Sequence, residues 1–448
     1  MSPVVSLAEA QMSSLLRAAR RLVQKPLLPR SFPTSGFEVI ANSRLVEEET
    51  WEWYSPDEFC PVRIGEVFKS QYQVVGKLGY GAFATVWLCR DLVEHRHVAL
   101  KIGACHALSG ELSVSEYLKT IRTSHAGSIL VRQTLDEFEI TRQAQKYQAI
   151  VYSPLAITLR GFRKMFRDQA LSVQLLRLVL KHIFIALDFL HTEARVIHTD
   201  IQEKNILLGL DDNTAEDDLN KFEQQEFESP SPRKIDGDRV IYTSRPLVPR
   251  IYNYGRPVLC DLGEARFREY NRMADIQPYQ YRAPEVILDI PWDHKADIWN
   301  VGVLIWDLFQ NGNLFKTTGG PENKQDNIYH LAHMIALLGP PPKDFLERTQ
   351  TERPWGWFDK DGNWKAAADI PNTNLEDAEK KLTGEDKVLF LRFVRKMLKW
   401  KPEERASAKE LLDDPWLNAV QKPLPRALVP AAPTSASPLL SARLRLSL

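Results

Sequence analysis

The feature that most constrains this chain is the segment 198–205, which reads His-Thr-Asp-Ile-Gln-Glu-Lys-Asn. It places the carboxylate of Asp200 five residues before the amide of Asn205. Alone, this spacing says little, because similar segments occur in many surface turns. Here a glycine-rich turn precedes the segment, and the triplet Asp261-Leu262-Gly263 follows it. The order of the three motifs is therefore informative where each motif by itself is not.

The glycine-rich turn lies within residues 77–87. Leu78, Val86 and Leu88 alternate on either side of it, which predicts two strands joined by the turn. Small residues in such a turn let backbone N–H groups approach the oxygens of a triphosphate. The candidate nucleotide-binding residues are Leu78, Gly79, Tyr80, Gly81, Ala82, Phe83, Ala84 and Val86. A hairpin turn without a ligand is the alternative interpretation.

About a dozen residues later, Val98-Ala99-Leu100-Lys101 predicts a strand that ends on a lysine. A lysine in this position is often only a solvated strand edge. At this distance from a glycine turn, we favour a phosphate-binding role for Lys101, with Ala99 lining the same site.

A phosphate-binding lysine needs a carboxylate from a helix to orient it, and Glu116 and Glu111 are the two candidates. We prefer Glu116, because apolar residues at near-helical spacing share its neighbourhood. These residues are Val114, Leu118 and Ile121. A solvated glutamate is the alternative.

Downstream, the apolar run 257–259 leads into Asp261, as a strand that delivers a magnesium-binding carboxylate into a turn should. Ala283-Pro284-Glu285 follows, and residues 297–306 have the composition of a buried helix. Arg405 is a late arginine that we expect to pair with Glu285. Both are structural rather than catalytic candidates.

This ordered set resembles the protein kinases and, more closely, the SR-protein kinase family. The likeness rests on residues 61–68 before Tyr72, on the glycine turn, and on residues 187–200. Thr199 is distinctive, because most kinases have arginine between the His and the Asp. The resemblance covers residues 54–417 and implies an α+β, bilobal kinase-like fold, with a small β-rich N-lobe and a large α-helical C-lobe.

We expect four parts: an N-terminal arm or transit segment (1–50), the kinase N-lobe (51–152), the kinase C-lobe (153–417) and a tail (418–448). The Pro, Ala, Ser and Leu content of the tail and its lack of acidic residues predict disorder. The hinge is expected at residues 152–155. Tyr152 would be the gatekeeper, and Ser153 and Leu155 would lie beside the adenine.

Two insertions interrupt the kinase pattern, at about 211–254 and 311–383. The first is acidic at its start and basic around Arg233, Lys234 and Arg239. Charge runs are usually solvated faces, and the alternative is a segment that docks or gates substrate. The second resembles the large-lobe insert of SR-protein kinases, although it mixes acids with bases.

By resemblance, Asp200 orients and deprotonates a substrate hydroxyl, and Asn205 and Asp261 hold Mg²⁺. Lys101, oriented by Glu116, positions the phosphates of ATP. Between Glu264 and Arg282 there is no Ser or Thr, which suggests a segment that is active without phosphorylation.

One departure puts activity in question. Gln202 stands where serine/threonine kinases have a lysine that neutralises the transferred phosphoryl group, and losing one such donor costs about 3 kcal/mol. Lys204, four residues after Asp200, is the predicted replacement cation. We therefore expect a protein serine/threonine kinase of the SR-protein-kinase type with an arginine-serine-rich protein substrate. The alternative is a pseudokinase that binds nucleotide or acts as a scaffold. A small-molecule phosphotransferase is disfavoured by the Ala-Pro-Glu motif and the large insert.

Composition limits the other classes. The formal charge of the 448 residues is zero, so we expect no nucleic-acid binding. The four cysteines lack metal or disulfide spacing, which fits a reducing compartment, and no apolar run reaches membrane-spanning length. We expect a monomer in the cytoplasm and nucleus. The basic, leucine-containing first thirty residues favour the alternative of a mitochondrial transit segment.

Overall fold

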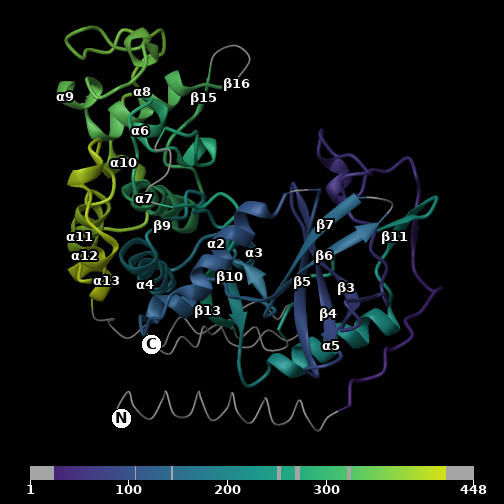
Figure 1. Ribbon diagram of the computed structural model, residues 1–448. Coiled ribbons are helices and arrows are strands. Elements are labelled where there is room, and N and C mark those ends of the chain that lie inside the picture. Colours follow the sequence, from purple (N-terminus) through teal and green to yellow (C-terminus); the bar gives the residue numbers. More distant parts are fainter. Residues whose placement is uncertain are drawn as a thin grey trace. The chain divides into compact units, whose positions relative to one another are not determined.

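A computed structural model describes residues 25–105, 107–142, 145–249, 254–267, 273–319 and 324–419. The basic segment before residue 25 and the part of the predicted tail after residue 419 lie outside these residues. The chain divides into two compact units (Figure 1). Unit 1 comprises Met1–Ser109, Thr134–Leu155 and Asn213–Val248, and unit 2 comprises Gly110–Gln133, Ala156–Asp212 and Pro249–Leu448.

Unit 1 is built on a six-stranded antiparallel sheet with the order β2-β3-β4-β5-β7-β6. The strands are β2 (Val67–Phe68), β3 (Tyr72–Tyr80), β4 (Ala84–Asp91), β5 (Arg96–Gly103), β6 (Thr134–Arg142) and β7 (Gln145–Tyr152). The glycine turn joins β3 to β4, so the predicted hairpin is confirmed. Alternate apolar residues such as Val74, Cys89 and Leu100 form the core beneath the sheet.

The first insertion also belongs to unit 1. It forms α5 (Ala215–Glu228), β11 (Arg233–Asp236) and β12 (Arg239–Tyr242), and β11 pairs in parallel with β1 (Val39–Ile40) of the N-terminal arm. Helix α5 buries Leu219 and Phe222, and a Cβ added at Gly76 of β3 would lie 3.0 Å from the Phe222 ring. This differs from the predicted arrangement, in which the insertion interrupted the C-lobe, because the apolar face of α5 is buried against β3.

Unit 2 is mainly helical. Its helices are α2 (Ser109–Thr120, after its first residue), η2 (Ala126–Leu130), α3 (Leu159–Lys164), α4 (Val173–Asp188), η3 (Phe189–Ala194), η4 (Tyr279–Tyr281), α6 (Pro284–Ile287), α7 (Lys295–Gln310), α8 (Asn327–Leu338), α9 (Lys343–Leu346), η5 (Arg353–Gly356), α10 (Leu375–Ala378), α11 (Gly384–Val394), η6 (Pro402–Glu404), α12 (Ala408–Leu412) and α13 (Pro415–Asn418). Its strands are β8 (Ile157–Thr158), β9 (Val196–Ile197), β10 (Ile206–Leu210), β13 (Tyr254–Leu259), β14 (Arg266–Phe267), β15 (Thr318–Gly319) and β16 (Lys324–Gln325).

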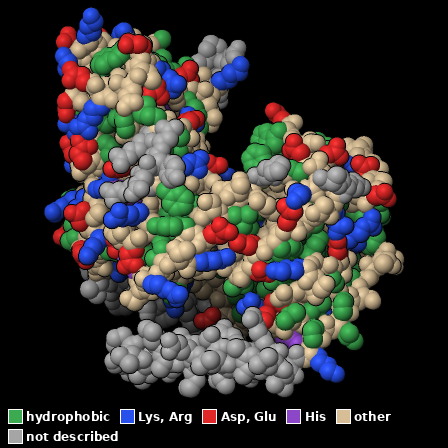
Figure 2. Space-filling model, in the orientation of Figure 1, with side chains coloured by type: hydrophobic (Ala, Val, Ile, Leu, Met, Phe, Trp, Pro, Cys, Tyr) green, Lys and Arg blue, Asp and Glu red, His purple; other side chains and the backbone are tan. Residues whose placement is uncertain are grey.

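Helix α7 forms the centre of unit 2, since every residue from Ala296 to Phe309 is buried. The predicted buried helix at 297–306 is thus confirmed. A strand-rich unit and a helix-rich unit confirm the predicted fold class. Acidic and basic side chains are interspersed over the visible face (Figure 2), which fits the zero net charge. Within the described ranges, no helix is both long and apolar enough to cross a bilayer.

Candidate active site

The segment 198–205 forms the loop between β9 and β10 in unit 2, and Asp297 of α7 anchors its base. The two oxygens of Asp297 accept the backbone N–H groups of His198 (2.9 Å) and Thr199 (2.8 Å). Its Oδ2 also lies 2.8 Å from His191 Nε2. Burial favours the neutral acid, but these partners outweigh burial and lower the pKa of Asp297. The anchor is therefore a charged carboxylate.

Two amide side chains hold the carboxylate of Asp200. Asn205 Nδ2 donates to Asp200 Oδ2 (2.6 Å) and to the Asp200 carbonyl oxygen (3.0 Å). Gln202 Nε2 donates to Asp200 Oδ1. Burial raises the pKa of Asp200, and the charges of His198 and Lys204 offset part of this rise. A fixed carboxylate with a raised pKa has the properties of a general base.

Gln202 therefore has a role that the sequence did not reveal. Its side chain is only 7% exposed and is directed at Asp200. Lys204 is exposed, and no ion pair within the described ranges involves its ammonium. The amide thus supports the base, while the lysine four residues after Asp200 keeps a solvated charge.

A cavity of about 280 Å³ adjoins this loop. It is lined by Arg160, Arg163, Gln202, Glu203, Lys204, Gln280, Tyr281, Asp307, Asn311, Gly312 and Asn313. Arg163 is fully engaged, because it donates to Glu203 through Nε (2.8 Å) and Nη2 (3.0 Å) and to Asn311 Oδ1 (2.5 Å). The Tyr281 hydroxyl donates to Asp307, and burial raises the pKa of Asp307 to about 6. The cavity suits a polar group.

Asp261 lies beside the loop because β13 pairs with β10. Leu259 is opposite Ile206, and the Cys260 N–H donates to the Asn205 carbonyl oxygen at 2.8 Å. The charge of Asp261 contributes to the raised pKa of Asp200, which indicates that the two carboxylates are close. Asp261 has a φ of +63°, a conformation that residues other than glycine seldom adopt. Such strain is common where a side chain is aimed at a ligand.

The side chains of Asn205 and Asp261 fit a magnesium ion. The Asn205 amide nitrogen is committed to Asp200, which leaves Oδ1 as a possible ligand. Carboxylate and amide oxygens are the hard donors that Mg²⁺ prefers, and Mg²⁺ usually takes few protein ligands beside substrate phosphates. Among the described residues, no cluster of three or more His, Cys, Asp and Glu could hold a metal ion.

The start of α2 also lies in this region, and it bears on the choice between the two glutamate candidates. Glu116 is exposed on α2, whereas Glu111 is only 3% exposed. A Cβ added at Gly110 would lie 2.9 Å from the Gly263 carbonyl oxygen, so the helix begins against the Asp-Leu-Gly turn. After burial, the charge of Glu111 is among the influences that raise the pKa of the Cys260 thiol. Burial and position thus favour Glu111 over Glu116.

The sequence did contain a signal for Glu111. Val114 and Leu118 are the buried apolar residues of α2, and they lie three and seven residues after Glu111. This is the spacing of one helix face, and Glu116 lies on another.

In unit 1, the predicted nucleotide-binding residues share one region of the sheet. The Gly81 N–H donates to the Ala84 carbonyl oxygen at 2.8 Å and closes the turn. Val86 is opposite Lys101, and Ala99, on the same face as Lys101, is opposite Tyr152. Nothing lies within 4 Å of the position of a Cβ at Gly79, so the backbone there is open to a ligand.

The remaining turn and hinge candidates have the expected places in the chain. Leu78 and Tyr80 end β3, Ala82 and Phe83 occupy the turn, and Ser153 and Leu155 follow β7. Phe83 is 58% exposed. Their roles toward a nucleotide remain predictions.

Arg405 and Glu285 form the predicted structural pair, which is confirmed. Both Nη atoms of Arg405 donate to the carboxylate at 2.6 Å, and both side chains are fully buried. The pair ties the Ala-Pro-Glu helix α6 to η6.

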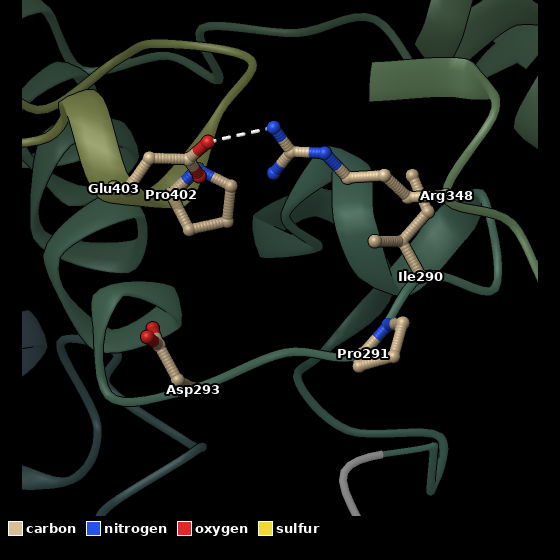
Figure 3. Close-up of a pocket in the computed structure, with 6 residues that line it drawn as sticks. All are labelled: Ile290, Pro291, Asp293, Arg348, Pro402 and Glu403. Carbon is tan, nitrogen blue, oxygen red and sulfur yellow. Dashed lines mark hydrogen bonds and ion pairs between the residues drawn. The ribbon is translucent and has the colours of Figure 1, made fainter. Parts of the chain in front are cut away.

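A second cavity of about 270 Å³ in unit 2 lies among Ile290, Pro291, Asp293, Arg348, Pro402 and Glu403 (Figure 3). An ion pair of 2.7 Å between Arg348 and Glu403 lies along it. None of the motif residues lines this cavity, so we do not include it in the active site.

Comparisons with known proteins agree with this geometry. A family model for the protein kinase domain matches residues 72–219 and 251–417. A serine/threonine protein kinase of Aspergillus fumigatus is 43% identical over 91% of this chain and 100% of its own length. Serine/threonine-protein kinase SRPK of Physarum polycephalum is 31% identical over 83% of this chain and 91% of its own. SRSF protein kinase 3 of Mus musculus is 24% identical over the same shares.

A solved kinase-domain crystal structure has a TM-score of 0.59 and 22% identity to this chain. The matched region spans 80% of this chain and 99% of the chain in that structure. At this identity, the likeness concerns the fold alone.

Proposed function

Because this chain belongs to the protein kinase family, as an SR-kinase-like member with serine/threonine kinase activity, we propose that Asp200 is the base for phosphoryl transfer from ATP to a protein hydroxyl. The observation that carries the proposal is the carboxylate held between Gln202 and Asn205. Its raised pKa prepares it to accept the hydroxyl proton.

The other groups have distinct tasks. Lys101 would position the phosphates, and the open backbone at Gly79 would accept their oxygens. Mg²⁺ held by Asn205 and Asp261 would neutralise charge on ATP.

Lys204 is the cation that we propose for the transferred phosphoryl group. Gln202 is committed to Asp200, so it is poorly placed to serve a phosphate as well. The exposed ammonium of Lys204 is mobile on a four-carbon stem, and a donor of this kind is worth about a hundredfold in rate.

We propose arginine-serine-rich segments as the substrate. The names of the relatives SRPK and SRSF protein kinase 3 support this class. The cavity beside Asp200 adds the Asp307 carboxylate, which is ionised above about pH 6 and would favour a basic neighbour of the target hydroxyl. By the same resemblance we propose the cytoplasm and nucleus as its location, which fluorescent fusions with and without residues 1–30 would test.

The deciding experiment is radiolabelled phosphate transfer from Mg-ATP to an arginine-serine repeat peptide and to a generic basic protein. We expect transfer by the wild type, none by Asp200→Ala, and about a hundredfold loss in Lys204→Ala. Lys409→Ala, at another exposed lysine of unit 2, is the matched control and should match the wild type. If the wild type bound ATP and transferred nothing, the pseudokinase alternative would replace the proposal.

A further inference from the structure

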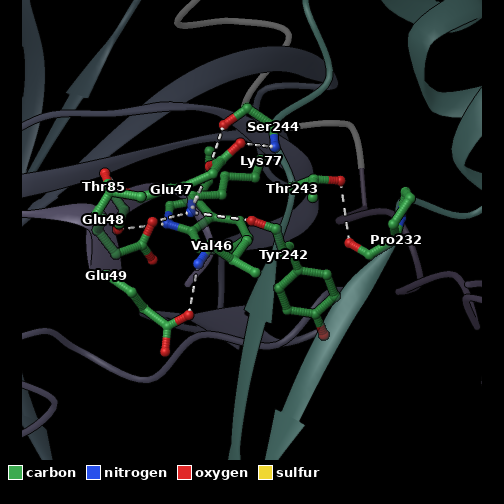
Figure 4. Close-up of polar contacts among 12 residues, drawn as sticks. Val46, Glu47, Glu48, Glu49, Lys77, Thr85, Pro232, Tyr242, Thr243 and Ser244 are labelled. Carbon is green, nitrogen blue, oxygen red and sulfur yellow. Dashed lines mark hydrogen bonds and ion pairs between the residues drawn. The ribbon is translucent and has the colours of Figure 1, made fainter. Parts of the chain in front are cut away.

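Lys77 is a fully buried lysine in β3, the strand that leads into the glycine turn. Its Nζ donates to Glu48 Oε2 and to the Tyr242 carbonyl oxygen (3.1 Å), and it lies 2.9 Å from Glu47 Oε2 (Figure 4). The two glutamates come from η1 (Glu47–Thr50) of the N-terminal arm, and Tyr242 ends β12 of the insertion. Three segments that are distant in sequence thus meet at one ammonium.

The insertion also binds the backbone of Lys77. The Arg245 N–H donates to the Lys77 carbonyl oxygen at 2.8 Å. Arg245 is fixed in turn by Glu226 of α5, whose Oε1 lies 2.7 Å from Arg245 Nε. Ser244 donates to Glu47 through its N–H (2.5 Å) and its hydroxyl (2.7 Å). The arm and the insertion are therefore bonded to each other as well as to Lys77.

The junction between arm and insertion continues away from Lys77. Lys234 of β11 pairs with Glu49 of η1 at 2.7 Å. The guanidinium of Arg233 lies between the rings of Phe37 (3.8 Å) and Tyr242 (4.7 Å). Cation–aromatic and ionic contacts of this kind, largely shielded from water, fix the two segments as one body.

The arm also reaches the tip of the glycine turn. The ring of Trp53 stacks on that of Phe83, with centroids 6.4 Å apart, and Trp51 stacks on Trp53 at 5.1 Å. The turn is thus held at its base through Lys77, and its tip contacts the same N-terminal segment through the Phe83 ring.

We propose that residues 25–60, which include the described part of the N-terminal arm, and residues 213–248 of the first insertion form a brace that fixes the glycine turn for nucleotide binding, with Lys77 as its positioning residue. The inference rests on the proposed binding of ATP phosphates at this turn. Without the ammonium, the buried carboxylate of Glu48 and the half-buried carboxylate of Glu47 are left as neighbours, which repel each other and release the brace. The turn then samples conformations that do not bind, and apparent affinity falls with the population of the competent one.

The test compares Lys77→Met with Lys69→Met. Lys69 also lies in unit 1 and pairs with Asp136 at 2.7 Å, but its side chain is 43% exposed, so it is a matched surface control. We expect Lys77→Met to raise the KM for ATP about tenfold, with kcat changed less than about threefold, and Lys69→Met to change neither. Lys77→Arg, which keeps the charge, should recover part of the affinity.

Direct titration with a fluorescent ATP analogue gives dissociation constants without any transfer, so a failure of phosphoryl transfer would remain distinguishable from a failure of the brace. If Lys77→Met does not fold, Ser244→Ala removes a single side-chain donor at the junction. By the same reasoning, we expect this variant to raise the dissociation constant for the ATP analogue two- to fivefold. Unchanged nucleotide affinity in the folded variants, or equal losses in Lys69→Met, would overturn the proposal.

Discussion

An Arg405→Met substitution would leave the Glu285 carboxylate buried without its partner. Besides its two bonds to Glu285, Arg405 donates to the carbonyl oxygens of Lys399 (3.0 Å), Lys295 (3.0 Å) and Trp400 (3.3 Å). Both side chains of the pair are fully buried. Removing one partner of such a pair costs about 3–5 kcal/mol of the free energy of unfolding. At about 2–4 °C per kcal/mol, the melting temperature of unit 2 should fall by roughly 10 °C.

Arg348→Met is the matched control. Arg348 pairs with Glu403 at the same kind of distance, 2.7 Å, but the side chains are 38% and 55% exposed. An exposed pair is worth about 0–1 kcal/mol, so this variant should melt within a few degrees of the wild type. Scanning calorimetry measures both variants.

A double variant, Glu285→Leu with Arg405→Met, separates the loss of the pair from the burial of a lone charge. Replacing both partners by apolar side chains should restore part of the stability that the single variant loses. The reasoning is refuted if Arg405→Met melts no lower than Arg348→Met, or if the double variant is less stable than Arg405→Met.

Three further outcomes follow from the site. Gln202→Ala removes a donor to Asp200, which raises the pKa of that base, so the acidic limb of kcat/KM against pH should move to higher pH; an unshifted limb would contradict the contact. Because burial raises the pKa of Asp307 to about 6 in the folded protein, the unfolded state loses this proton at lower pH than the folded state does. The unfolding free energy of the wild type should therefore fall relative to Asp307→Asn between about pH 4 and pH 6, by at most about 3 kcal/mol, and parallel urea-denaturation curves would argue against it. Glu111→Gln should lower kcat/KM about a hundredfold, and Glu116→Gln less than twofold; the reverse order in steady-state kinetics would identify Glu116 as the functional glutamate.

The sequence was sufficient for those parts of the fold that depend on local pattern and motif order. The hairpin at residues 77–87 follows from alternating apolar residues around glycines, and the helix at 297–306 from its largely apolar composition behind the Ala-Pro-Glu motif. The partnership of Glu285 and Arg405 followed from the order of the motifs, because both belong to recognisable segments.

The packing of the insertion was not predictable, because its partners are remote. Arg233 and Lys234 have the composition of a solvated charge run, yet both are buried. Lys234 is bonded to Glu49, which is 185 residues away in the sequence, and Arg30 is bonded to Glu223, which is 193 residues away. A charged side chain is predicted to be exposed unless its partner is known. Nothing in the local sequence pattern identifies that partner. The partner of Gln202 could not be predicted either, because its side-chain rotamer determines whether the amide donates to Asp200 or to a phosphate.

The division of the chain has a consequence for synthesis on the ribosome. The polypeptide passes between the units at residues 109–110, 133–134, 155–156, 212–213 and 248–249. Unit 1 thus lacks its closing segment when the last strand of its main sheet, β7, has emerged, and it waits about 90 residues for Arg245. At about 5–20 residues per second this delay is roughly 5–20 s, during which Glu47, Glu48 and Lys77 have no insertion to cover them. The nascent sheet must therefore stay soluble on its own, and a fragment that ends near residue 155 would be arrested in that immature state.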